Sequence, residues 1–444
     1  MDPHRLLKHL ACKTNCNIDA GLVAFFLSAA LACSIPAAHA ATWDGGGADN
    51  LWTNPLNWGG TAPVALDPLV FAGTTQLTSN NTFTANTQFN GITFNAGAGA
   101  FVLQGNAINL GGNIVDNSTS PQQILTPFVL QQDTSISNTG NKTLTMASIS
   151  GASALTKSGS GLVIFIGAGF SYTGGTTVSQ GTLRSTPDST ANVFGTGDIS
   201  IASGATLEFR AISTNTVVTG NVISGAGTVN IFGQTGTSVE VLSGANTYTG
   251  VTTVSTGTLL INGSLGNTGA NVSVANLATL GGNGTISRSV SVAAGGILSP
   301  GGMSGGTSLA GTLDLAGGGA TSGLTLADTS VLKFNLQQGN FTEGGGINDL
   351  ITVGGALTLD GTLQITELGG SLTNGTYRLF TYTGALTDNT LIIDAAFSTT
   401  HAGSTIDKSV ASQINLIVAP EPSTFVLLAL SLTTVVVLRF RRRA

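Results

Sequence analysis

The residues of this 444-residue chain that could act as nucleophiles or bases are few and far apart. Its three cysteines lie at positions 12, 16 and 33, so thiol catalysis would be confined to that end. Beyond residue 40 the chain has a single histidine, His401, in the sequence Ser-Thr-Thr-His-Ala-Gly. A catalytic histidine needs a nucleophile to deprotonate and a third group that orients it, and no local motif supplies them. We therefore expect His401 to be an exposed turn residue without a catalytic role.

Paired carboxylates are the second chemistry to consider, because two carboxyl groups a few ångströms apart can hydrolyse a glycosidic bond. The eighteen acidic residues between positions 41 and 418 are mostly isolated in the sequence, and no Asp-Asp pair occurs. Stacked strands could still bring distant acids together, and the pairs to inspect are Asp198 with Glu208 and Asp314 with Asp360. A polysaccharide hydrolase or lyase is therefore the alternative function, although no catalytic residue is assigned.

The glycine-rich segments do not supply a metal or phosphate site. Gly281-Gly282-Asn283-Gly284 begins like a calcium-binding nonapeptide but lacks its aspartate. No Gly-Lys-Ser or Gly-Lys-Thr tripeptide is present to form a phosphate-binding loop. We therefore predict no metal and no cofactor.

Charge argues against nucleic acid as a partner. Residues 41–418 carry eight basic and eighteen acidic side chains, a net charge near −10, whereas the whole chain has −6. Binding of phosphates needs clustered lysine and arginine, and these eight are scattered. With 41% hydrophobic and only 8% charged residues, the chain is also too apolar to be disordered. The composition favours a folded, exported β protein.

Residues 1–40 have the pattern of a secretory signal peptide. Basic residues precede an apolar stretch from Gly21 to Ile35, and Ala38-His39-Ala40 supplies the small residues of a cleavage site. Signal peptidase would cut after Ala40 and remove all three cysteines. The stability of the exported chain would then come from packing and backbone pairing, without disulfides.

Residues 419–444 have the three parts of a processed membrane anchor. The backbone at Pro420-Glu421-Pro422 must be extended, because proline fixes its own φ and restricts the residue before it. An apolar run from Phe425 to Leu438 follows and predicts one short transmembrane helix. The basic residues after it would hold this end in the cytoplasm; they are Arg439, Arg441, Arg442 and Arg443.

This tail resembles the PEP-CTERM protein-sorting signal of Gram-negative bacteria, because the motif, the apolar helix and the arginine cluster follow in that order. The resemblance implies that an exosortase, a membrane cysteine protease, cuts near Pro420-Glu421-Pro422 after transient anchoring in the inner membrane. The protein would then reach the cell surface or extracellular matrix, alongside exopolysaccharide. A permanent single-pass anchor is the alternative, and it would leave the C-terminus intact.

Between these two ends the pattern is that of short β-strands. Segments of alternating apolar and polar residues, such as 198–201 and 311–315, are separated by glycine-rich turns. Helical periodicity is absent from Trp43 to Val418. We therefore expect strands with one buried and one solvated face.

The sequence also repeats itself. Residues 165–183 align without gaps on residues 241–259, with ten identities in nineteen aligned positions. Repetition of one supersecondary unit implies that the units stack. One copy is expected to form one coil of a solenoid, with Tyr172 and Tyr248 at equivalent stacked positions and glycines at the corners.

The pattern Gly-Ala-Asn-Thr-Tyr-Thr-Gly-x-Thr-Thr-Val-Ser-x-Gly-Thr-Leu at residues 244–259, and more loosely at 168–183, resembles the autotransporter-associated β-strand repeat. The opening Thr-Trp-Asp-Gly-Gly-Gly at residues 42–47 is similar to the start of many autotransporter passenger regions. The resemblance implies a right-handed parallel β-helix.

Together these features predict an all-β chain, a right-handed parallel β-helix preceded by a signal peptide and followed by one short C-terminal transmembrane helix. Trp43, Trp52 and Trp58 are expected to cap the first coil, and a carbohydrate-stacking platform is the alternative for them. The expected division is a signal peptide at 1–40, an N-terminal β region with the cap at 41–150, the repeats at 151–262, further coils at 263–418 and the sorting signal at 419–444.

The expected function is structural or adhesive and not enzymatic. The chain would be an exported, surface-sorted protein of the cell envelope or exopolysaccharide matrix of a Gram-negative bacterium. Its expected partners are signal peptidase and an exosortase as processing enzymes, the membrane through the C-terminal helix, and an extracellular polysaccharide. A permanently membrane-anchored adhesin is a third possibility.

Overall fold

The computed structural model describes residues 40–140, 142–187, 194–210, 212, 216–233, 238–266, 269–304, 307–317 and 319–419. They belong to a compact unit that begins at Ala40. Outside the described residues lie the predicted signal peptide up to residue 39, with Ala38, and the sorting signal from residue 420 onward. The second group includes Pro420-Glu421-Pro422, the apolar run Phe425 to Leu438 and the arginine cluster. No helix within the described ranges is long and apolar enough to cross a membrane.

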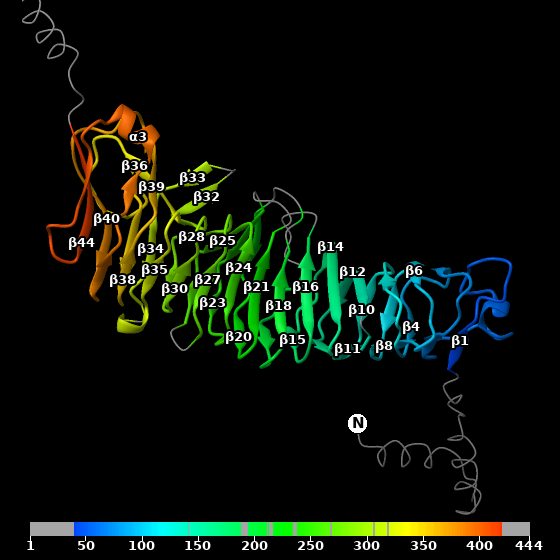
Figure 1. Cartoon of the computed structure of the whole chain (residues 1–444). Helices are drawn as coiled ribbons and strands as arrows, with labels where there is room; N and C mark the ends of the chain where they lie inside the picture. The colour runs from blue at the N-terminus through cyan, green and yellow to red at the C-terminus, as the bar shows by residue number, and fades with distance from the viewer. Residues whose placement is uncertain are drawn as a thin grey trace, which may run out of the picture. The chain divides into compact units, whose positions relative to one another are not determined.

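Strands of successive coils pair in parallel, so the chain winds as a β-solenoid (Figure 1). Ile199 pairs with Ile223 of the following coil, and Val272 pairs in the same way with Val290. The separation along the chain is larger between the paired residues Thr312 and Leu350, where longer loops are inserted. The prediction of an all-β parallel β-helix is confirmed, while its right-handedness stays a prediction.

The strands form four long sheets in the described part of the chain. Each sheet makes up one face of the solenoid, either over its whole length or over part of it. Sheet 1 contains β1 (Ala41–Trp43), β2 (Leu69–Phe71), β5 (Ile92–Phe94), β8 (Ile114–Asp116), β11 (Thr134–Asn138), β13 (Leu155–Ser158), β15 (Thr176–Val178), β17 (Ile199–Ile201) and β20 (Ile223–Gly225). Sheet 2 contains β3 (Thr78–Asn81), β4 (Thr87–Phe89), β6 (Val102–Gly105), β7 (Ile108–Leu110), β9 (Gln122–Ile124), β10 (Phe128–Leu130), β12 (Thr143–Gly151), β14 (Leu162–Phe170), β16 (Thr182–Thr186), β18 (Thr206–Phe209), β21 (Thr228–Phe232), β24 (Thr252–Thr256), β27 (Val272–Val274), β30 (Val290–Val292), β35 (Leu324–Leu326), β38 (Leu357–Leu359) and β41 (Leu386–Asp388).

The other two long sheets belong to the second half of the chain. Sheet 3 contains β19 (Thr216–Thr219), β22 (Val239–Leu242), β25 (Thr258–Ile261), β28 (Thr279–Gly282), β31 (Ile297–Pro300), β36 (Val331–Gln337), β39 (Thr362–Leu368) and β42 (Ile392–Ile393). Sheet 4 contains β23 (Ala245–Asn246), β26 (Ser264–Leu265), β29 (Thr285–Ile286), β34 (Thr312–Leu315), β37 (Leu350–Val353), β40 (Gly375–Tyr382), β43 (Thr405–Asp407) and β44 (Gln413–Val418). A small antiparallel hairpin adds β32 (Gly302–Ser304) and β33 (Thr307–Leu309).

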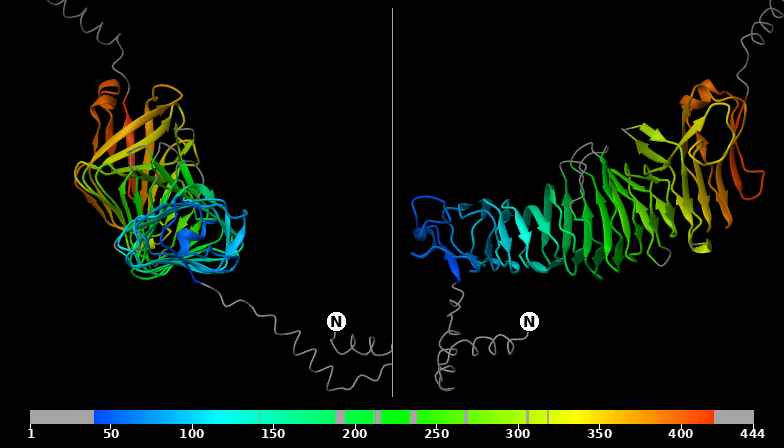
Figure 2. Two further views of the ribbon diagram at one scale, coloured as in Figure 1. Left: turned by 90° about the vertical axis from the view of Figure 1, so that its right-hand side faces the viewer. Right: turned by 180° about the vertical axis from the view of Figure 1, so that it is seen from behind.

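The short strands follow from the alternation in the sequence. In β27 and β30 the two valines are buried and the serine between them points outward. Successive residues of a strand point to opposite faces, so a three-residue strand buries two side chains and exposes one. Inward residues from all coils join into one apolar core that extends from Ala41 to Val418. Figure 2 shows the coils enclosing this interior.

Three tryptophans begin the core. The rings of Trp43 and Trp58 meet edge to face with centroids 5.1 Å apart, and those of Trp52 and Trp58 with centroids 6.1 Å apart. Their exposed fractions are 0%, 0% and 3% for Trp43, Trp52 and Trp58. The alternative of a carbohydrate-stacking platform is therefore wrong, because buried rings offer no face to a sugar.

The two sequence repeats each span one coil, as predicted. Phe165 pairs with Ser185 on the next coil, and Glu240 pairs with Leu259. The copies nevertheless lie on different faces of the solenoid. Thr176 of the first copy pairs with Ile199 in sheet 1, whereas its counterpart Thr252 pairs with Val229 in sheet 2.

The last coils end in antiparallel pairing and a short helix. β44 pairs antiparallel with β40 on one side and with β43 on the other. The helix α3 (Ala395–Thr400) begins after Asp394, whose side chain accepts a hydrogen bond from the Phe397 amide at 2.8 Å. The expectation of strands does not hold for these six residues, because a short capped helix shows no helical periodicity in the sequence. The described helical segments also include η1 (Pro55–Trp58) and η2 (Gly319–Thr321).

Candidate functional site

His401 is buried and lies within reach of a serine and a glutamate. Its ring is 1% exposed and stacks on Phe397, with centroids 4.3 Å apart and an interplanar angle of 9°. The prediction of an exposed histidine is wrong, because these residues are four apart in the sequence and α3 brings their side chains onto one side. The Nε2 atom lies 3.2 Å from Ser371 Oγ and 3.3 Å from Glu367 Oε1.

This cluster lacks the geometry of a nucleophilic relay. In a serine–histidine–acid triad the serine and the acid bind opposite nitrogens of the imidazole. Here both Ser371 and Glu367 approach Nε2, while Nδ1 lies 3.0 Å from Thr400 Oγ1. Glu367 Oε1 also accepts the Leu372 amide at 2.6 Å. The arrangement therefore joins α3 to the connection between β39 and β40.

The candidate carboxylate pairs are not brought together. Glu208 in sheet 2 forms an ion pair with Arg184 at 2.7 Å, whereas Asp198 directly precedes β17 in sheet 1. Asp314 belongs to β34 in sheet 4, whereas Asp360 follows β38 in sheet 2 and accepts the Gly361 amide at 2.8 Å. Among the residues with described positions, no group of three or more His, Cys, Asp or Glu side chains could hold a metal ion.

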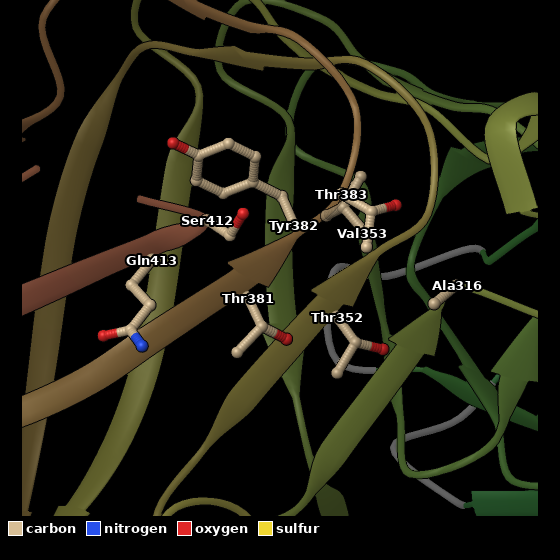
Figure 3. A pocket seen from close by; sticks show the side chains of 8 residues that line it. All are labelled: Ala316, Thr352, Val353, Thr381, Tyr382, Thr383, Ser412 and Gln413. Atoms are coloured by element: carbon tan, nitrogen blue, oxygen red, sulfur yellow. The ribbon is translucent and has the colours of Figure 1, made fainter. Parts of the chain in front are cut away.

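A hollow of about 290 Å³ lies where β34, β37, β40 and β44 run side by side in sheet 4 (Figure 3). We call it the sheet 4 hollow. Strand register places Asp314, Thr352, Thr381 and Gln413 in one row across the four strands. The residues lining the hollow are Ala316, Thr352, Val353, Thr381, Tyr382, Thr383, Ser412 and Gln413.

Hydrogen bonds fix the polar groups around this hollow. Asp314 Oδ1 accepts from the Thr352 hydroxyl and from the Ala316 amide, the latter at 2.8 Å. Arg378 Nη2 donates to Gln413 Oε1 at 2.7 Å, which leaves the amide nitrogen of Gln413 as a donor. The lining thus offers hydroxyl and amide groups, while the nearby carboxylate is already engaged. Such a surface can bind a small polar group but supplies no general acid or base.

Two buried cations brace the coils and were not recognised from the sequence. Lys157 Nζ donates to the carbonyl oxygens of Ser158, Gly159 and Gln180 at 2.9, 2.6 and 2.9 Å. Burial lowers the pKa of Lys157 to about 8. Because the acceptors belong to two successive coils, the ammonium group holds a corner of the solenoid together.

Arg288 acts in the same way across three coils. Its guanidinium donates to the carbonyl oxygens of Gly266 at 2.9 Å, of Gly250 at 3.2 Å and of Tyr248. It also lies over the ring of Tyr248, 4.6 Å from the centroid. In the sequence both cations are isolated, and no local pattern distinguishes them from surface residues.

Glu240 and Asp349 are among the acids that are buried in the described coils. Burial raises the pKa of Glu240 to about 8, although a hydrogen bond from Thr219 Oγ1 at 2.7 Å opposes the shift. Burial raises the pKa of Asp349 to about 7. The Asp349 carboxylate accepts the backbone amide of Gly311 at 2.7 Å and that of Asn335 at 2.7 Å, so it ties the loop before β37 to the start of β34 and to β36.

Of the predicted processing residues, Ala40 alone lies within the described part of the chain. Ala40 is exposed and directly precedes β1. A cut after this residue would leave every described strand intact. Ala38, Pro420, Glu421 and Pro422 lie outside the described residues, as do the anchor and its arginines.

Known proteins share the repeats of this chain. The family described as Passenger-associated-transport-repeat matches residues 155–184 and 232–261. The first match contains the sequence copy at 165–183, and the second contains the copy at 241–259. The chain is 39% identical over 198 residues to the adhesin BmaC autotransporter of Brucella suis biovar 1 (strain 1330). The similarity covers 44% of this chain and 5% of that relative. The expected resemblance to autotransporter passenger repeats is thus supported in the described coils.

Proposed function

We propose that this chain is an exported adhesive protein that a Gram-negative bacterium displays on its surface. The observation that carries the proposal is the parallel β-solenoid built from passenger-type repeats, together with the similarity to an autotransporter adhesin. Because the similarity spans a small part of that relative, it supports a class of protein and not a particular receptor. Extracellular polysaccharide is the ligand class that we propose.

The maturation that we propose has two cuts. Signal peptidase acts after Ala40, and an exosortase acts at Pro420-Glu421-Pro422 after transient anchoring in the inner membrane. The second step is supported by the order of the proline motif, the apolar run and the arginine cluster in the sequence.

The hydrolase or lyase alternative is not favoured. The acids that the alternative required lie in different sheets, and the buried His401 has both Ser371 and Glu367 on one nitrogen. The chain is therefore proposed to act by binding.

Attachment of the producing bacterium tests the function. Deletion of the gene is expected to lower attachment to polysaccharide-coated surfaces, and the full-length gene is expected to restore it. A variant with Pro420→Ala and Pro422→Ala should leave an uncut C-terminus, as measured by mass spectrometry of membrane and extracellular fractions. Unchanged attachment after deletion would refute the adhesive function, whereas a normal cut in the double variant would refute only the exosortase step.

A further inference from the structure

One outward column of side chains in sheet 2 carries a hydroxyl group on six successive coils. Strand register places Thr253 beside Ser273, Ser273 beside Ser291, and Ser291 beside Thr325. The row continues from Thr325 through Thr358 to Thr387. We call the set the hydroxyl column; its members are Thr253, Ser273, Ser291, Thr325, Thr358 and Thr387.

The hydroxyl column is accessible to solvent and its hydroxyl groups are unused. Ser291, Thr325 and Thr387 are exposed, and the other three residues are half-buried. Within the part of the chain that the structure describes, none of the six hydroxyls makes a hydrogen bond to another protein group. Some outward hydroxyls on other strands are engaged, as in Ser224, which donates to the Ile199 carbonyl at 3.2 Å.

Around Ser273, Ser291 and Thr325 the positions on both sides of the column are small and uncharged. Backbone hydrogen bonds continue the ladder through Ala275, Ala293 and Ala327 on one side. On the other side the corresponding positions are Asn271, Ser289 and Gly323. No long or charged side chain therefore interrupts the middle of this surface.

Spacing and charge together indicate the kind of partner. Strands in neighbouring coils lie about 4.8 Å apart, so the hydroxyls recur at that interval along the stack. One exposed hydroxyl adds little to binding, because its hydrogen bond replaces one to water. Several hydroxyls on a rigid frame can together bind a polymer whose units repeat. The translational and rotational entropy of association is then lost only once for all of these contacts.

We infer that the hydroxyl column binds a neutral, extended polysaccharide that lies along the stack of coils. Successive sugar units of such a chain present hydroxyl groups at regular intervals, and no charge is needed to match the surface. An anionic chain would meet Asp360, two residues after Thr358, near one end of the column. The inference rests on the proposed adhesive function and gives it a binding face.

A binding experiment with the full-length protein tests the column. The probes are four neutral polysaccharides (amorphous cellulose, chitin, xylan and galactomannan) and one anionic polysaccharide, polygalacturonate. The test variant combines Ser273→Ala, Ser291→Ala and Thr325→Val, which removes three hydroxyls and keeps inward residues unchanged. We expect the parent to bind at least one neutral probe and the variant to bind it about tenfold more weakly.

The control variant removes the same number of hydroxyls from another face. It combines Thr156→Val, Thr177→Val and Ser200→Ala, which lie in one outward row of sheet 1 and likewise make no described side-chain hydrogen bond. This variant is expected to bind like the parent. A single exposed change, Ser291→Asp, is expected to weaken binding as well, and equal thermal unfolding midpoints show that all variants are folded.

Three results would overturn the inference: no binding of the parent to any neutral probe, tighter binding to polygalacturonate, or equal weakening in test and control variants. Attachment of cells that carry each variant separates this inference from the adhesive function. Cells with the test variant that attach like the parent would refute the column and leave adhesion standing. Failure of all cells to attach, although the purified protein binds a neutral probe, would refute adhesion alone.

Discussion

Glu240 lies on the inward side of β22, between Val217 of the preceding coil and Leu259 of the next. Burial raises its pKa to about 8, so the folded protein holds this proton more tightly than the unfolded chain does. The contribution of this group to stability is complete below the ordinary pKa of about 4.5 and is lost as the pH rises through 8. Stability should therefore fall with rising pH in this window.

The substitution Glu240→Gln tests this pH dependence. Glutamine keeps the shape and can still accept from Thr219, but it cannot ionise. We expect the variant to be more stable than the parent at pH 8 by a few kcal/mol, roughly, and nearly equal at pH 4.5. Urea unfolding at several pH values measures the difference. The same loss of stability between pH 4.5 and 8 in both proteins would contradict the assignment.

Arg288 gives a second prediction for a single residue. The carbonyl oxygens of Tyr248, Gly250 and Gly266 are spread over three coils, so the single nitrogen of Arg288→Lys cannot reach them together as the planar fork of arginine does. The acceptors of Lys157, by contrast, lie in only two coils. We expect a loss of about 2–4 kcal/mol, because buried acceptors are left unpaired. Arg378→Lys is the control, since Arg378 is partly exposed in its ion pair with Glu343 and should cost less than about 1 kcal/mol. Thermal unfolding of both variants decides.

The turn that contains Tyr172 in the first sequence copy and Tyr248 in the second has the same hydrogen bond in both. Each phenol is buried and shares a hydrogen bond with the threonine four residues later, Thr176 at 2.6 Å and Thr252 at 2.7 Å. The turn keeps this structure although it leads into sheet 1 in one copy and into sheet 2 in the other. The turn is thus a local unit that does not depend on the face it enters.

Removal of the two phenol hydroxyls should therefore have similar costs. Tyr172→Phe and Tyr248→Phe are each expected to lower the free energy of unfolding by about 1–2 kcal/mol, because a buried hydrogen bond to a threonine hydroxyl is lost. The cost of Tyr172→Phe should be the smaller one, since Thr176 Oγ1 also donates to the Phe194 carbonyl at 3.4 Å. Tyr382→Phe is the control, since that phenol makes no described hydrogen bond and is only partly buried. Denaturant unfolding of the three variants provides the comparison. A large cost in one copy and none in the other would show that the turn is not autonomous.

How far the sequence predicts these elements depends on whether the cause is local. Alternation in segments such as Val272-Ser273-Val274 predicts the strands and their buried faces, and the aligned copies predict that one copy makes one coil. The burial of His401 was missed because α3 is a single turn. Pairs such as Asp198 and Glu208 could not be judged, because the face that each strand joins depends on the lengths of the intervening loops. The roles of Lys157 and Arg288 depend on contacts between coils, which leave no local signature.

At the scale of the whole described chain, each coil contacts the coils before and after it. Stability in such a stack is close to a sum of terms from each unit and its neighbours. The described body has no disulfide to add a constraint across many coils, because all cysteines precede it. A defect in one coil should therefore weaken its neighbours more than distant coils.

The substitution Leu207→Asp tests this independence. Leu207 is fully buried in β18, near the middle of the stack, and pairs with Leu183 and Val229. A buried charge there costs several kcal/mol, roughly, and is expected to divide unfolding into two transitions. Hydrogen exchange should show lost protection around β16, β18 and β21, with retained protection in β5 and β39. A single transition shifted as a whole would show that the stack unfolds as one unit.

The antiparallel placement of β44 determines how the protein would carry mechanical load. Suppose that the C-terminal end of the protein is attached to the cell and that the coils bind a polymer away from it. A force that separates the two then puts tension on the chain just after Val418. Tension along a strand loads its lateral hydrogen bonds together, because those bonds run across the direction of pull. With β40 on one flank and β43 on the other, two rows of bonds share that force. The parallel coils that precede β40 would then be loaded in shear only after β44 has separated from its two neighbours.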